Sequence, residues 1–153
     1  MKLAEALVSR ADLNARIDQL NERIQRCVLV QEGEQQLEDP NLLLTELNQN
    51  LERLRDLITR INLTNLQTIL EPQQISLTAA LAQRDVLARQ HGLLSGITKV
   101  ASERFNRYSR SEIRILPAID IGAIHHQIDD IARQRRELDT AIQSANWATE
   151  LLE

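Results

Sequence analysis

Apolar residues recur every three or four positions along four stretches of this chain, and three breaks separate the stretches. This spacing places apolar side chains on one face of an α-helix. The stretches cover about residues 2–31, 40–65, 76–104 and 120–147. Long helices joined in this way favour an up-down-up-down arrangement. We therefore predict an all-α protein, an antiparallel four-helix bundle with long helices and an ordered connection at residues 105–119.

Composition agrees with this fold class. The 153 residues are 42% hydrophobic, which suits one core and a single helical-bundle domain over residues 1–153. Aromatic residues make up only 2%, which is poor material for a β-sandwich.

Start and stop signals mark the breaks. Gly33 is expected to end the first helix, and Asp39 with Pro40 to begin the second, because Asp caps free amides and Pro tolerates the first helical position. Ser76 and Asp120 are the expected caps of the third and fourth helices. The apolar seam of the second helix is predicted at Leu43, Leu47, Leu51, Leu54, Ile58 and Ile61.

Two glycines interrupt the third stretch. Gly92 and Gly96 each cost about 1 kcal/mol relative to Ala inside a helix. Either a neighbouring helix approaches closely at these positions or the segment bends.

Charge narrows the choice of partners. The formal net charge of −4 argues against broad binding to nucleic acid or to an anionic membrane, since both need a basic surface. No apolar run has the length of a membrane span, and Glu5 and Arg10 interrupt the start of the chain. We expect a cytoplasmic protein with no nucleic-acid and no membrane partner.

Antiparallel packing would bring the first and third breaks to one end of the bundle. The first break, QEGEQQLED, is acidic, whereas the third, RFNRYSRSEIR, carries four Arg and one Glu. These loops either neutralise one another, within the chain or across a neighbouring subunit, or bind a small anionic ligand, because planar guanidinium groups and hydroxyls suit phosphate and carboxylate. The candidate ligand or interface residues are Glu32, Glu34, Arg107, Tyr108, Ser109, Arg110, Ser111, Glu112 and Arg114.

A second polar cluster is expected at the opposite end. There the close of the second helix should approach the close of the fourth and the start of the chain, which brings together Asn62, Asn65, Asn146 and Trp147. We expect these side chains to hydrogen-bond the free backbone groups at the helix ends and to fix the register of the packed helices. A small-molecule pocket is the alternative.

Catalytic and metal motifs are missing from the sequence. His126 and Asp130 share a helix face, but two ligands do not make a metal site. There is no P-loop, dinucleotide fingerprint, zinc cysteine set or nucleophile elbow. We therefore assign no catalytic residue, metal or cofactor, and an enzyme of familiar design is not predicted.

Short motifs along the chain carry a family resemblance. They are MKLAEAL with RADL, VQEGE with EDP, RIN with TN, LAQRDVL, RYSRSEIR, RELD, and NW with LLE. In these the chain resembles a small bacterial family called septicolysin-like, otherwise treated as a domain of unknown function. The resemblance implies an all-helical bacterial protein, and it supplies no catalytic residues. The name suggests a cytolysin, which the absence of a membrane-length segment disfavours.

The leading hypothesis is a non-enzymatic helical-bundle protein that acts through self-association as a homo-oligomer, or through other protein contacts. An anion-binding module or enzyme that uses residues 104–114 is the alternative. A lytic protein is a disfavoured third.

Overall fold

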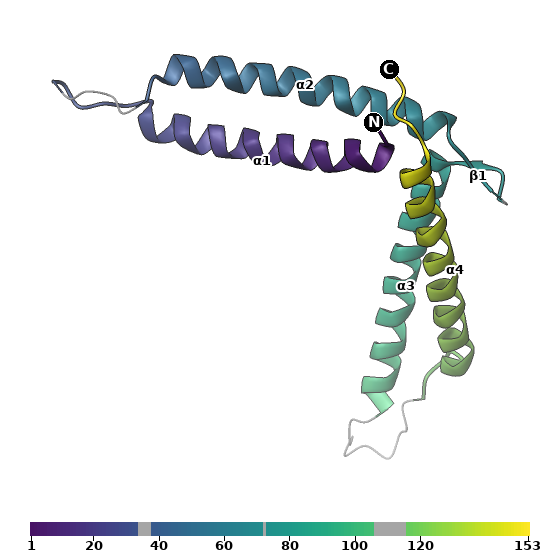
Figure 1. Cartoon of the computed structure of the whole chain (residues 1–153). Helices are drawn as coiled ribbons and strands as arrows, with labels where there is room; N and C mark the ends of the chain where they lie inside the picture. The colour runs from purple at the N-terminus through teal and green to yellow at the C-terminus, as the bar shows by residue number, and fades with distance from the viewer. Residues whose placement is uncertain (34–37, 72, 106–115) are drawn as a thin grey trace. The chain divides into compact units, whose positions relative to one another are not determined.

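The computed structural model of the chain contains four long helices and one small β-hairpin (Figure 1). It describes residues 1–33, 38–71, 73–105 and 116–153. The elements in chain order are α1 (Leu3–Cys27), α2 (Pro40–Gln67), β1 (Ile69–Leu70), β2 (Ile75–Ser76), α3 (Leu77–Phe105) and α4 (Ile121–Ala148). The all-α class and the four long helices are as predicted from the sequence. Most of the predicted ordered connection, residues 106–115, lies outside the described residues.

Side-chain caps fix the starts of three helices at the predicted residues. The Asp39 carboxylate accepts the Asn41 backbone N–H at 2.8 Å, with Pro40 as the first helical residue. Ser76 Oγ accepts the Ala79 N–H at 3.2 Å, and Asp120 accepts the Ala123 N–H at 3.0 Å. Each cap satisfies one of the backbone donors that a helix start leaves without a partner.

The chain divides into two compact units, each described by itself. The first, called unit 1, contains residues 1–68 and 145–153, and unit 2 contains residues 69–144. Because α4 runs without interruption from Ile121 to Ala148, its last turn belongs to unit 1 and the rest to unit 2. The single domain over residues 1–153 stays a prediction.

Unit 1 is built on the antiparallel hairpin of α1 and α2 (Figure 1). Its core contains Leu3, Ala6, Leu20, Leu57 and Ile61, all buried. Arg16 of α1 pairs with Glu46 of α2 at 2.6 Å and fixes the register of the two helices on their exposed side.

The buried face of α2 differs from the predicted seam. Leu51 and Ile58, two predicted seam residues, are 44% and 37% exposed. The residues that α2 buries instead are Leu43, Asn50, Leu57, Ile61 and Thr64. The physical reason is that one partner helix covers only a narrow strip, so neighbouring apolar residues remain open to solvent.

Unit 2 contains the β-hairpin, α3 and most of α4, and α3 and α4 run in opposite directions (Figure 1). Its core is formed by Leu70, Leu77, Ala80, Leu87, Ile131, Leu138 and Ile142. β1 and β2 pair antiparallel, with Ile69 opposite Ser76 and Leu70 opposite Ile75. The sequence predicts only a break between helices at these residues, because two-residue strands leave no alternation to detect.

The end of the first helix is corrected, and one of the two alternatives for Gly92 and Gly96 is excluded. The first helix ends at Cys27, before the predicted stop near Gln31, and Gly33 lies in the following turn with a φ of 86°. At Gly92 and Gly96, no neighbouring helix approaches closely: a Cβ built on either residue would meet no atom within 4 Å. Among the described residues, no helix combines the length and apolar character that a membrane crossing requires.

Candidate functional site: an apolar groove on α3

An apolar hollow lies along the C-terminal half of α3. It has a volume of about 610 Å³ and lies within unit 2. Its lining residues are Gly92, Leu93, Gly96, Ile97, Val100 and Ala101 of α3, and Leu116, Pro117, Ala118 and Ile119 of the segment before α4. We call this hollow the α3 groove. Its volume falls in the range of ligand sites, and every residue that lines it is Gly or apolar.

The groove exists because two side chains are missing from the helix surface. Gly92 and Gly96 lie one turn apart, and the space where their side chains would stand is open. Larger residues form the walls and are open to solvent: Leu93 is 60% exposed and Leu116 is 67% exposed. Contiguous apolar surface of this kind marks contact sites on soluble proteins more often than single exposed residues do.

The buried polar group of this part of α3 is satisfied within the helix. Thr98 is 5% exposed, and its hydroxyl donates to the carbonyl oxygens of Leu94 at 3.2 Å and Ser95 at 3.0 Å. Thr98 therefore requires no ligand, and the groove offers contact through apolar area.

The sequence from residue 86 to residue 116 is basic, although the protein as a whole is acidic, and the side chains of Arg104, Arg107, Arg110 and Arg114 in this stretch lie outside the described residues. Residues 86–116 contain six Lys or Arg and two Glu, a formal charge of +4. The remaining residues contain twelve basic and twenty acidic side chains, a formal charge of −8.

The predicted Arg/Glu site is described only in part. Glu32 is exposed in the turn after α1. Glu34 and the whole Arg-rich set, Arg107, Tyr108, Ser109, Arg110, Ser111, Glu112 and Arg114, lie outside the described residues. Whether the two loops meet stays a prediction.

One acidic residue between α1 and α2, Glu38, is neutralised by an arginine of α1 in the same hairpin. Glu38 forms an ion pair with Arg23 of α1, and the Nε of Arg23 donates to the second carboxylate oxygen at 3.2 Å. This hydrogen bond lowers the pKa of Glu38 and raises that of Arg23.

The Arg23–Glu38 pair should make hairpin stability depend on pH. Because the folded-state pKa of Glu38 is lowered, the pair stabilises the fold above the unfolded pKa of about 4.3, and the stabilisation is lost as the pH falls through the folded value. We expect Glu38→Gln to lower the melting temperature slightly at pH 7 and by a smaller amount at pH 3. Thermal unfolding followed by circular dichroism measures this, with Glu52→Gln on the exposed face of α2 as control. An equal effect at both pH values would contradict it.

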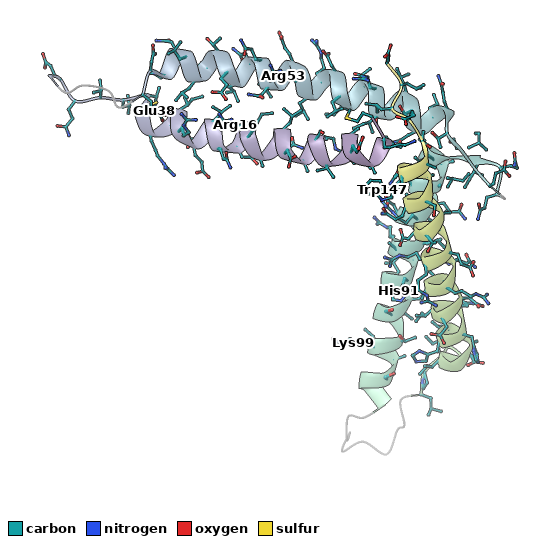
Figure 2. The ribbon with its side chains drawn as sticks, viewed as in Figure 1. Arg16, Glu38, Arg53, His91, Lys99 and Trp147 are labelled. Atoms are coloured by element: carbon teal, nitrogen blue, oxygen red, sulfur yellow. The ribbon has the colours of Figure 1, made fainter. Side chains whose placement is uncertain are left out.

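The second predicted cluster lies at the other end of unit 1. Asn146 is buried and Asn65 is half-buried, whereas Asn62 is exposed. Trp147 is 62% exposed at the end of α4 (Figure 2). Sequence reasoning placed these helix ends together, and unit 1 brings the end of α2, the end of α4 and the start of the chain into contact.

Residues that the sequence analysis did not select make most of these contacts. The Leu152 N–H donates to the Thr64 hydroxyl at 3.0 Å, and the Nε of Arg60 donates to the Leu152 carbonyl at 2.8 Å. The N–H of Leu3 donates to Thr149 at 2.9 Å. We call this arrangement the terminal clasp, formed by Met1–Leu3, Arg60, Thr64 and residues 148–152.

Charge reinforces the terminal clasp. The Nζ of Lys2 lies 2.7 Å from a carboxylate oxygen of Glu150 and donates to the Ala148 carbonyl at 3.0 Å. The hydrogen bond from Lys2, followed by that from the terminal amine, lowers the pKa of Glu150. The clasp satisfies helix-end groups through these residues, and the role predicted for Asn62, Asn65, Asn146 and Trp147 stays a prediction.

Thr64 is the centre of the clasp, since its hydroxyl also donates to the Arg60 carbonyl at 2.8 Å. Thr64→Val keeps the shape of this buried side chain but leaves the Leu152 N–H without its acceptor. We expect a loss of about 1–3 kcal/mol in the free energy of unfolding, measured by urea denaturation. Thr59→Val, at an exposed hydroxyl of α2, should cost much less. Equal losses in the two variants would contradict the assignment.

Metal-ligating side chains do not gather in the described residues: no group of three His, Cys, Asp or Glu is placed to hold an ion there. His126 and Asp130, which share a face of α4, are both exposed.

The fold and the groove define a class, namely an all-helical protein built on long helical hairpins with an apolar groove on one of its helices. A family model described as "Family of unknown function (DUF6847)" matches residues 10–151, and the chain belongs to this family. The comparison with curated proteins found no match.

A solved structure supports the same assignment. The chain is 39% identical to a functionally unknown conserved protein from Corynebacterium diphtheriae, whose crystal structure it matches with a TM-score of 0.88 over 99% of each chain. Both comparisons support an unknown-function family, as the resemblance implied, and neither supports the septicolysin-like name.

Proposed function

We propose that the chain is a non-enzymatic protein that acts through self-association and protein contacts, with the α3 groove as its contact surface. The observation that carries this proposal is the apolar groove of about 610 Å³ between solvent-exposed aliphatic walls. Grooves of this kind accept the apolar face of a partner segment, and burial of their walls stabilises the complex by about 25 cal/mol for each Å² removed from water.

The cost of the two glycines supports the same proposal. Two glycines in one exposed helix together cost about 2 kcal/mol of helix stability relative to Ala, and a Cβ added to either would lie within 4 Å of no atom in the described residues. If a partner must approach the helix backbone closely, glycine is needed at positions 92 and 96. Packing within the chain supplies no such reason for glycine there.

Filling the groove tests the proposal. Gly96→Leu places a side chain in open space, so we expect the variant to fold with unchanged helicity. We expect static light scattering at several concentrations to show association for the unmodified chain and at least a tenfold weaker association for Gly96→Leu. Ala88→Leu, at an exposed position of α3 outside the groove, should associate normally. A monomeric unmodified chain at every concentration, or association untouched by Gly96→Leu, would overturn the proposal.

The excess of arginine at residues 104–114 favours a second candidate, an anion-binding module or enzyme. This candidate predicts that a phosphate or carboxylate ligand raises the melting temperature, and that Arg107→Ala together with Arg110→Ala abolishes the rise. A thermal-shift panel of nucleotides, sugar phosphates and dicarboxylates measures it, and no response across the panel counts against it.

A further inference from the structure

We propose that two copies of this chain associate symmetrically through α4, with Arg135 of each copy paired with Asp139 of the other. The inference rests on the proposed function, because it adds the register of α4 to the same self-association. Its basis is a guanidinium and a carboxylate, one turn apart on α4, that have no side-chain partner in the described part of the chain.

Arg135 lies on the buried face of α4 but finds no acceptor there. It follows Ile131 by four residues and precedes Leu138 by three, and both of these neighbours are buried. The Nε of Arg135 is itself buried and donates to no atom of the described residues, whereas the side chain as a whole is half-buried. A charged donor without an acceptor is costly, and folded proteins rarely leave one so. A carboxylate brought by a partner would compensate this guanidinium.

Asp139, one turn further along α4, is the complementary group. It is half-buried, and its carboxylate forms no hydrogen bond or ion pair within the described residues. The other half-buried carboxylates of this part of the chain each have an arginine: Glu38 pairs with Arg23, and Glu46 pairs with Arg16 at 2.6 Å. Asp139 is therefore the half-buried acid that lacks a cation there.

The order of the two residues explains why they do not pair within α4. Two ion pairs between residues one turn apart, Glu22 with Arg26 at 3.3 Å and Asp130 with Arg133 at 2.9 Å, both place the acid first. This order is the favourable one at such a spacing, and the reverse order is weaker. In the unpaired set of α4 the arginine comes first, so both groups remain available to a partner outside the helix.

A twofold axis brings the two groups together across two copies. When two α4 helices pack antiparallel about an axis at Glu137, midway between the two residues, Arg135 of each copy lies opposite Asp139 of the other. One contact then forms two identical ion pairs. Such an isologous contact uses the same patch on both copies and closes as a dimer. Ile128 and Ala132, half-buried on the same side of α4, supply apolar area beside the ion pairs.

Charge reversal tests this pairing in full-length variants. Arg135→Glu leaves an acid at both positions, and Asp139→Arg leaves a base at both, so each variant alone would face its own like charge. We expect each to associate about tenfold more weakly than the unmodified chain. An equimolar mixture of the two variants should recover association, as should the double variant that carries both changes. Analytical ultracentrifugation at several concentrations measures these associations.

Arg133→Glu is the matched control. It makes the same change of charge two residues away, on the opposite side of α4, and should associate like the unmodified chain. Circular dichroism checks that each variant remains helical. Recovery in the mixture requires folded chains, so misfolding cannot produce it.

The outcomes separate this inference from the proposed function. If the single reversals associate like the unmodified chain, or if the mixture or the double variant stays weak, the α4 pairing is overturned and the α3 groove is not. If the reversals behave as expected but Gly96→Leu associates normally, the α4 pairing is supported and the groove is overturned as the contact surface. An unmodified chain that is monomeric at every concentration overturns both.

Discussion

Leu3→Ala is expected to lower the free energy of unfolding by about 2–5 kcal/mol, because it removes a large side chain from a fully buried position. Leu3 is 0% exposed in unit 1, and its N–H holds the terminal clasp through Thr149. The substitution leaves that backbone bond intact but opens a cavity beside it. In a chain of this size each kcal/mol lowers the melting temperature by roughly 2–4 °C.

The measurement is urea unfolding followed by circular dichroism at 222 nm and by the fluorescence of Trp147, the only tryptophan of the chain. Val8→Ala is the matched control, since Val8 lies one to two turns further along α1 and is 59% exposed. We expect the control to change stability by less than about 0.5 kcal/mol. Similar losses in both variants would show that Leu3 is not part of the core.

Leu77→Ala in unit 2 is expected to have an effect of similar size. Leu77 begins α3 and is 1% exposed, so its truncation also leaves a cavity worth about 2–5 kcal/mol. Val86→Ala, at a 63% exposed position of the same helix, is the control. The comparison separates loss of burial from any change in helix propensity.

The same variant tests whether residues 1–153 unfold as one domain. Trp147 belongs to unit 1, but α4 continues from it into unit 2 without a break. If the continuous helix couples the units, Leu77→Ala should move the fluorescence transition together with the circular dichroism transition. A fluorescence midpoint that stays at the unmodified value while the circular dichroism midpoint falls would contradict the single-domain prediction.

Much of the fold could be predicted because its signals are local. The caps at Asp39, Ser76 and Asp120 depend on a side chain and the backbone two or three residues away, and all three occur as expected. The three-to-four-residue spacing of apolar residues is also a local signal, because it predicts a helix regardless of which segment the helix packs against. The β-hairpin was missed because its strands have two residues each, which gives periodicity nothing to measure.

The candidate site was harder to predict for a physical reason. Gly92 and Gly96 predict from the sequence either a close neighbouring helix or a bend, and the structure has open space beside both residues. The repeat of Val86, Leu93 and Val100 at seven-residue spacing was the available signal for an exposed stripe. Periodicity shows that apolar residues share a face, and it does not show whether that face is covered.

The sequence by itself determined the helical class, the positions of the breaks and the segregation of acidic and basic residues between two of them, because propensity, capping and charge are properties of short segments. Only the tertiary structure decided which apolar residues are buried. In α2, Leu57 is buried and the neighbouring Ile58 is exposed. Leu152 donates a hydrogen bond to Thr64, which is distant in sequence, and the face of α3 with Leu93 and Ile97 is exposed. Burial depends on which partner segment lies opposite, and that information is distributed over the whole chain.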